Sequence, residues 1–116
     1  MKDISFKIKP GEIVALVGES GVGKTTLIDL LSGYHWPSRG KILIDNQDIS
    51  EVSLESLRKN IALVPQEITL FNDTIKNNIR YGKPRASDRE IIEAAKAAHA
   101  DEFIQKFPKK YEQIVG

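Results

Sequence analysis

A glycine-rich segment near the start of the chain combines residue types that can bind phosphate. The segment GESGVGKTT occupies Gly18–Thr26 and completes the pattern G-x-x-x-x-G-K-[ST] with Gly18, Gly23, Lys24 and Thr25. Glycines let the backbone turn sharply and leave its N–H groups free to point at an anion. The Lys24 ammonium would reach the β- and γ-phosphates of a nucleotide, and the Thr25 hydroxyl would ligate Mg²⁺. The segment therefore predicts a phosphate-binding loop.

The whole loop is expected to contact the nucleotide. Thr26 would lie close to the α-phosphate. Glu19, Ser20 and Val22 matter more for their backbone groups than for their side chains. The predicted nucleotide-binding residues are Gly18, Glu19, Ser20, Gly21, Val22, Gly23, Lys24, Thr25 and Thr26. A glycine-rich turn without a ligand is the alternative, but a lysine followed by a threonine has no purely structural reason to occur there.

The elements around the loop favour a strand, a loop and a helix in that order. The continuous apolar run Ile13–Val17 is typical of a strand covered on both faces. Apolar residues at helical spacing within Leu27–Leu31 predict a buried helix after the loop, and Gly33 supplies its end.

Strands alternate with helices up to about residue 72, and helices dominate after it. Further strands are predicted at Ile4–Ile8, Ile42–Ile44 and Ile61–Val64, with a turn at Asp45-Asn46. Helices are predicted at Leu54–Lys59, at Thr74–Ile79 and at Asp101–Lys106. Ser53 would cap the first of them. A further helix is predicted after Ser87, which forms a capping box with Glu90. The change of pattern predicts a subdomain boundary near residue 72.

Composition excludes several classes of function. A chain of 116 residues is one domain or part of one. The net charge of +1 gives no sign of a nucleic-acid surface, and the basic stretch Lys106–Lys110 is interpreted as solvated surface. The chain has no cysteine, so a disulfide framework or thiolate metal site is excluded. Its longest apolar run is far below the roughly 18 residues that cross a bilayer.

The remaining sequence resembles one family of phosphate-loop proteins. The segment LVPQEITLFNDTIKNNIRYG at Leu63–Gly82 is similar to the Q-loop region of ATP-binding cassette (ABC) ATPases of the exporter type. Gly40–Gln66 resembles the stretch between the phosphate loop, or Walker A motif, and the Q-loop. Ala94–Gly116 resembles the exporter helical subdomain. The resemblance implies an α/β fold of the P-loop NTPase class, with a partial ATPase core sheet and P-loop helix at 1–72 and the start of an incomplete helical subdomain at 73–116.

The resemblance also implies a second site residue, Gln66, at the position of the Q-loop glutamine. In the family this residue contacts Mg²⁺ and the region of the attacking water. A neutral amide suits that role, because it can accept from water and present an oxygen to a hard cation. The implied cofactors are ATP and Mg²⁺. Lys24 and Gln66 are the implied catalytic residues, and Thr25 and Gln66 the implied metal ligands.

Several family motifs are absent from the sequence. It contains no LSGGQ signature, no Walker B strand with its metal-binding Asp, no adjacent Glu base and no switch His. His35 and His99 are not at the switch position. The chain therefore looks like the first half of a nucleotide-binding domain, and we expect it to bind nucleotide without turnover. In the family the Walker B strand lies beside the P-loop strand, so Ile13–Val17 would form an open apolar edge that favours low stability or self-association.

The family implies partners and a location. These are a second nucleotide-binding domain that meets the first head to tail, and a transmembrane domain that meets Glu67–Asp73, on the cytoplasmic side of a membrane. No nucleic acid is expected. The alternatives are a non-catalytic nucleotide-binding module and a soluble ABC-type ATPase, and apolar helices of about 20 residues upstream would favour the exporter. A small-molecule kinase that shares only the loop is disfavoured by Gln66 and its setting.

Overall fold

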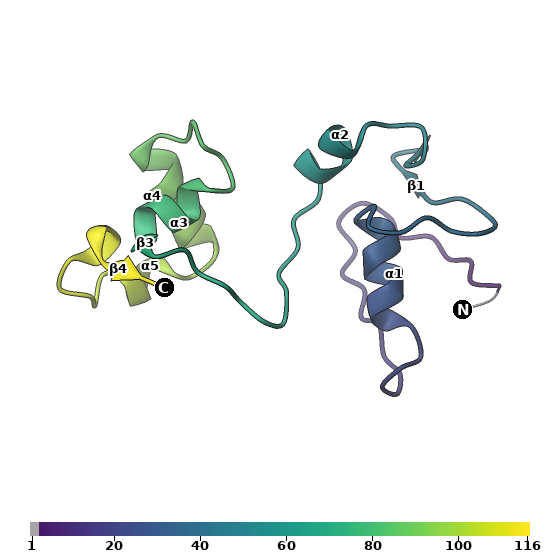
Figure 1. The fold of residues 1–116 in the computed structure, drawn as a ribbon, viewed down its shortest axis with the longest axis horizontal. Helices are drawn as coiled ribbons and strands as arrows, with labels where there is room; N and C mark the ends of the chain where they lie inside the picture. The colour runs from purple at the N-terminus through teal and green to yellow at the C-terminus, as the bar shows by residue number, and fades with distance from the viewer. Residues whose placement is uncertain (1–2) are drawn as a thin grey trace. The chain divides into compact units, whose positions relative to one another are not determined.

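Short helices and two-residue strands, with no long strand among residues 3–116, organise the structure. The computed structural model describes residues 3–116, and the chain separates into two units, one ending at Leu63 and the other running from Val64 to Gly116 (Figure 1). Each unit has its own contacts and its own small core. The two units are therefore described one at a time.

The first unit contains two helices and a hairpin. Its elements are α1 at Lys24–Leu31, β1 at Leu43–Ile44, β2 at Gln47–Asp48 and α2 at Leu54–Lys59. The strands are antiparallel, with Ile44 opposite Gln47. The turn between them places Asp45 at φ 49° and Asn46 at φ 64°, the left-handed conformation that tight hairpin turns require. The predicted turn and short strand are thus confirmed.

Local caps define the ends of both helices in this unit. The Ser56 N–H donates to the Ser53 hydroxyl at 3.2 Å, so Ser53 caps α2 as predicted. At the end of α1, Gly33 has φ +69° and its N–H donates to the Leu30 carbonyl at 3.2 Å. A Cβ added at Gly33 would lie 2.9 Å from a methyl carbon of Leu54 and 3.0 Å from one of Leu57. Gly33 therefore ends α1 and also lets α2 approach it closely.

The second unit is mainly helical. Its elements are β3 at Asp73–Thr74, α3 at Ile75–Arg80, α4 at Asp88–Ala97, α5 at Asp101–Ile104, the 3₁₀ helix η1 at Lys110–Glu112 and β4 at Ile114–Val115. β3 and β4 pair antiparallel, with Thr74 opposite Ile114. The buried side chains Ile91, Ala95 and Ile104 form the small core. The helices expected after residue 72 are confirmed.

Polar side chains reinforce this helical unit. The Ser87 hydroxyl accepts from the Glu90 N–H while the Glu90 carboxylate accepts from the Ser87 N–H, which confirms the predicted capping box. The Lys83 ammonium lies 2.5 Å from the same carboxylate. Near the C-terminal side, the Tyr111 hydroxyl donates to Asp101 Oδ1 at 2.6 Å. Burial and this acceptor raise the pKa of Tyr111 to about 12.

Three predicted strands are absent among residues 3–116. Ile4–Ile8, Ile13–Val17 and Ile61–Val64 run without strand pairing in the described chain, so these strand predictions are wrong. The run expected to be covered on both faces is open to solvent, with Ile13 101% and Val17 92% exposed. The physical reason is that an apolar run indicates only that its side chains favour burial. A β-strand forms only where a neighbouring strand pairs with its backbone N–H and carbonyl groups. No described segment supplies them here.

Among residues 3–116, we found no helix with the length and apolar character needed to cross a membrane.

Replacing Gly33 by alanine is expected to destabilise the first unit by about 1–3 kcal/mol, because the new Cβ meets both leucines and the left-handed backbone strains an L-residue. Gly40→Ala is the matched control, since Gly40 has φ +82° but nothing within 4 Å of an added Cβ. Urea unfolding followed by fluorescence of the single tryptophan, Trp36, measures both. Equal losses in the two variants would show that the contact with α2 contributes nothing.

The second unit is expected to lose stability in acid through Glu90. The Lys83 ammonium, then the Ser87 N–H and hydroxyl, lower the pKa of Glu90 from 4.5 to about 2. A lowered native pKa gives stability that is present above pH 4.5 and lost as the pH falls toward 2. Glu90→Gln should flatten the dependence of the urea midpoint on pH in this window. Glu102→Gln, which removes the same charge at an exposed position, should leave the slope unchanged, and a steep slope in Glu90→Gln would contradict the assignment.

Candidate functional site: a phosphate-binding loop

The predicted loop is closed by its own lysine. The Lys24 ammonium donates to the Gly18 carbonyl at 2.7 Å and to the Glu19 carbonyl at 2.6 Å. The side chain therefore runs back along the loop from the first residue of α1 to the loop's beginning. This places a positive charge beside the backbone groups that the sequence analysis assigned to phosphate binding.

The start of α1 has free donors. Gly23 is the residue before the helix, has φ 101° and provides no side-chain cap. Within residues 3–116, none of the N–H groups from Glu19 to Thr26 donates a hydrogen bond. Such unpaired donors together with the helix dipole favour an anion. The donor set therefore fits a phosphate chain.

The loop is also narrow where it begins. A Cβ added at Gly18 would lie 3.0 Å from a methyl carbon of Val22, tighter than ordinary contact. A side chain at Gly18 would therefore have to displace Val22. The need for glycine at this position follows from the close approach of the loop to itself.

The two threonines occupy the first turn of α1. Thr25 and Thr26 are exposed, and their hydroxyls make no hydrogen bond to another group of the described chain. A hydroxyl at this place can meet a phosphate oxygen or a metal ion held by the phosphates. No cluster of three or more His, Cys, Asp or Glu side chains suited to a metal is present in residues 3–116. The oxygen ligands that this loop offers are thus the hydroxyls of its serine and threonines, its backbone carbonyls and the single carboxylate of Glu19.

The structure brings Gly18–Thr26 together in the first unit. Gln66 belongs to the second unit, where it is exposed and forms a bend with Glu67 directly after Pro65. Its side chain makes no hydrogen bond to another described residue. Its amide is therefore accessible to a ligand.

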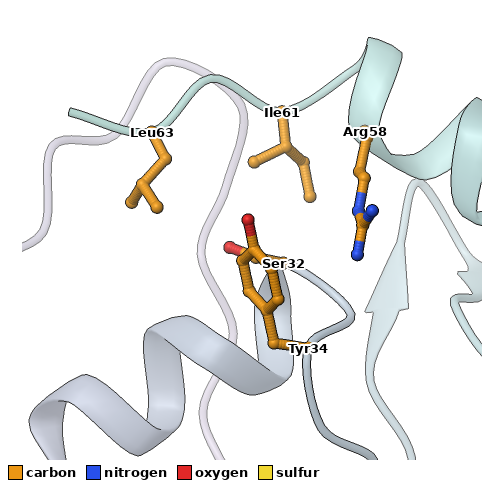
Figure 2. Close-up of a pocket in the computed structure, with 5 residues that line it drawn as sticks. All are labelled: Ser32, Tyr34, Arg58, Ile61 and Leu63. Atoms are coloured by element: carbon orange, nitrogen blue, oxygen red, sulfur yellow. The ribbon is translucent and has the colours of Figure 1, made fainter. Parts of the chain in front are cut away.

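A hollow of about 200 Å³ lies apart from the loop residues (Figure 2). Figure 2 shows Ile61 and Leu63 on the segment after α2, facing Ser32 and Tyr34 at the end of α1, with Arg58 beside them. The Arg58 guanidinium carbon lies 5.1 Å from the centre of the Tyr34 ring, a cation–π distance. This contact gives Tyr34 a packing role at the surface. The hollow contains none of the predicted site residues.

Asn78 on α3 has a structural role that the sequence did not predict. Its side-chain amide makes hydrogen bonds to the backbone of three earlier residues, Phe71, Asp73 and Thr74. A signal was available, because asparagine is a poor residue for a helix interior and often bonds to nearby backbone instead. The signal does not tell which backbone groups are bound.

Known proteins resemble this chain over its whole length. The lipid A-core flippase of Syntrophus aciditrophicus is 49% identical over 116 residues, and the mitochondrial iron-sulfur clusters transporter atm1 of Aspergillus fumigatus is 51% identical over 116 residues. These matches cover 100% of this chain but 19% and 16% of the two relatives. The chain therefore spans about a fifth or less of the length of these relatives.

A solved structure shares the fold. A bacterial Atm1-family ABC exporter with ATP bound matches 84% of this chain at 47% identity, with a TM-score of 0.77, and the match covers 17% of that exporter chain. The glycine-rich loop has free N–H donors and leads into a helix. Together with the structural similarity to this exporter, it defines a protein of the P-loop NTPase class. A sequence model of the ABC transporter family matches residues 1–114. The chain belongs to the ABC transporter family and corresponds to part of the ATP-binding region.

Proposed function

We propose that this chain binds MgATP through Gly18–Thr26 and serves an exporter that couples ATP binding and hydrolysis to transport. The observation that carries the proposal is the uncapped start of α1, where the N–H groups from Glu19 to Thr26 have no acceptor among residues 3–116 and Lys24 lies across the loop. The flippase and the atm1 transporter are relatives at about half identity, which supports an exporter context.

The proposed roles follow from the chemistry of each group. The backbone N–H groups and the Lys24 ammonium bind phosphate oxygens and neutralise their charge. The Thr25 hydroxyl and the Gln66 amide oxygen hold Mg²⁺, which prefers oxygen ligands and keeps phosphate oxygens among them. When bound, Mg²⁺ supplies charge neutralisation to the phosphates. Gln66 additionally orients water near the γ-phosphate, so Lys24 and Gln66 are the proposed catalytic residues.

The finer domain organisation is part of the proposal. Residues 1–72 form the partial ATP-binding core and residues 73–116 begin the helical subdomain. The compact unit at Val64–Gly116 is mainly helical, which supports a helical second part. The proposal assigns Gln66 to the segment that leads from one part to the other.

The proposed partners are a second nucleotide-binding domain and a transmembrane domain on the cytoplasmic side of a membrane. The transmembrane domain would meet Glu67–Asp73. This stretch carries the apolar side chains Ile68, Leu70 and Phe71, which are 71%, 49% and 52% exposed. Exposed apolar side chains that lie close together along the chain support a contact with another protein at this surface.

The chain is expected to bind MgATP weakly and to show no multiple-turnover hydrolysis, because no residue in it provides the general base or the opposing signature. Lys24→Ala should weaken MgATP binding by about tenfold or more, since it removes a charge-assisted phosphate contact. Lys41→Ala, which removes an exposed lysine of the same unit, is the matched control. Titration calorimetry measures both, and circular dichroism confirms that each variant folds.

Equal affinity in the Lys24→Ala variant and the unmodified chain would contradict the proposed site. Turnover that Lys24→Ala abolishes would instead contradict the non-catalytic part of the proposal.

A further inference from the structure

The hollow at the end of α1 contains a buried hydroxyl without a hydrogen-bond partner. Ser32 is only 7% exposed, and its backbone N–H donates to the Ile28 carbonyl at 2.9 Å. Its hydroxyl makes no hydrogen bond to another group among residues 3–116. No enclosed side-chain nitrogen or oxygen in this part of the chain lacks a partner, so the Ser32 hydroxyl reaches the open space of the hollow. A hydroxyl in such a position is satisfied by water or by a ligand.

A guanidinium with unused donors lies at the same hollow. The guanidinium carbon of Arg58 is 5.1 Å from the centre of the Tyr34 ring, so the ring occupies one face of the cation and leaves its N–H edges open. Within residues 3–116, the guanidinium forms no ion pair. Figure 2 shows the Arg58 side chain extending toward Tyr34, and the hydroxyl oxygens of Ser32 and Tyr34 directed toward the segment after α2. The hollow therefore offers a cation and two hydroxyls.

Two apolar side chains form the opposite wall of the hollow. They are Ile61 and Leu63, and Leu63 is 50% exposed. None of the residues that line the hollow is acidic. On α2, the carboxylate of Glu55 is already paired with Lys59 at 2.7 Å. The lining thus combines a positive charge that has no counter-ion in it with an apolar surface that is open to water, and this combination favours an anion with an apolar body.

A carboxylate is the anion that fits these groups. The planar guanidinium can donate two parallel hydrogen bonds to a carboxylate, and the two hydroxyls can donate to the same oxygens. A phosphate would meet the same donors but would leave the apolar wall in water. The volume of about 200 Å³ lies below the roughly 300–1,000 Å³ of sites for drug-sized ligands. The body of the ligand is therefore small, about the size of one benzene ring.

We propose that this hollow is a binding site for a compact monocarboxylate. The carboxylate lies at Arg58 and at the hydroxyls of Ser32 and Tyr34, and the apolar body packs against Ile61 and Leu63. All five residues belong to the first unit, and none of them is part of the phosphate-binding loop. The inference is therefore independent of the proposed function.

The test uses benzoate as the probe and the full chain as the protein. Nuclear magnetic resonance titration of the methyl signals of Ile61 and Leu63 gives the dissociation constant, with benzamide as the neutral isostere and acetate as the anion without a ring. Arg58→Gln removes the cation, Arg58→Lys keeps the charge without the planar fork, and Ser32→Ala removes the buried hydroxyl. Arg39→Gln, which removes an exposed arginine of the same unit, is the matched control. Circular dichroism verifies that each variant folds.

Benzoate should shift the Ile61 and Leu63 signals and bind with a dissociation constant of about 1 mM, as a small ligand in an open site does. Arg58→Gln should weaken binding about tenfold, because it removes a charge-assisted contact. Arg58→Lys and Ser32→Ala should each weaken it about threefold. Arg39→Gln should bind benzoate like the unmodified chain. Benzamide and acetate should each bind at least about fivefold more weakly than benzoate, since each lacks one half of the recognised structure.

Equal affinity for benzoate in the Arg58→Gln variant and in the unmodified chain overturns the inference. So does benzoate binding that shifts only signals from Gly18–Thr26, because the ligand then occupies the phosphate-binding loop. Acetate that binds as tightly as benzoate overturns it as well, since no apolar body is then recognised. If Arg58→Gln does not fold, the comparison of benzoate with benzamide in the unmodified chain decides, and equal affinities overturn the inference.

Discussion

Unpaired backbone N–H groups at the start of α1 are the constraint on which the rest of the site depends. A helix begins with donors that have no intrahelical acceptor, and most helices supply a side-chain oxygen for them. Here Ser53, Thr74 and Ser87 cap three other helices, whereas Gly23 caps nothing. Water can accept hydrogen bonds from these free N–H groups, but the negatively charged oxygens of a phosphate are better acceptors for them. Gly23 provides no side-chain cap for that helix end, and the Lys24 ammonium lies across the loop beside it.

The second unit satisfies its polar groups differently, through side chains placed to meet backbone. Asn78 binds the Phe71 backbone, and the Asp73 carboxylate accepts from the Thr74 N–H at 2.6 Å. Arg80 donates to Asp88 Oδ1 at 2.6 Å, which joins α3 to α4. With only three side chains in its buried core, such a unit relies on these contacts to hold short elements in place. The start of α1 in the first unit thus leaves backbone donors without acceptors among residues 3–116, whereas side-chain hydrogen bonds hold the segments of the second unit together.

Prediction from sequence succeeded where neighbours along the chain decide the structure. The Ser87 and Glu90 capping box, the Asp45-Asn46 turn and the stop at Gly33 involve partners within a few residues, so residue type and spacing contain the needed information. It failed at Ile13–Val17, where the apolar pattern was correct but the strand depends on a hydrogen-bonding neighbour. Prediction also failed to find the hydrogen bonds of Asn78 to the Phe71 backbone, because the low helix propensity of asparagine does not indicate which backbone groups its side chain binds.

Taken alone, the sequence determined that a glycine-rich loop with the phosphate-binding pattern precedes a helix and where most helices begin, and it predicts which loop residues would face a nucleotide. These properties rest on backbone freedom and on contacts within one or two helical turns. Only the tertiary structure decided that Lys24 lies back over Gly18, that Gly33 admits α2, and that Asn78 holds Phe71. Each of these depends on groups that the chain must first fold to bring together, and loop closure between them carries an entropy cost that spacing alone does not reveal.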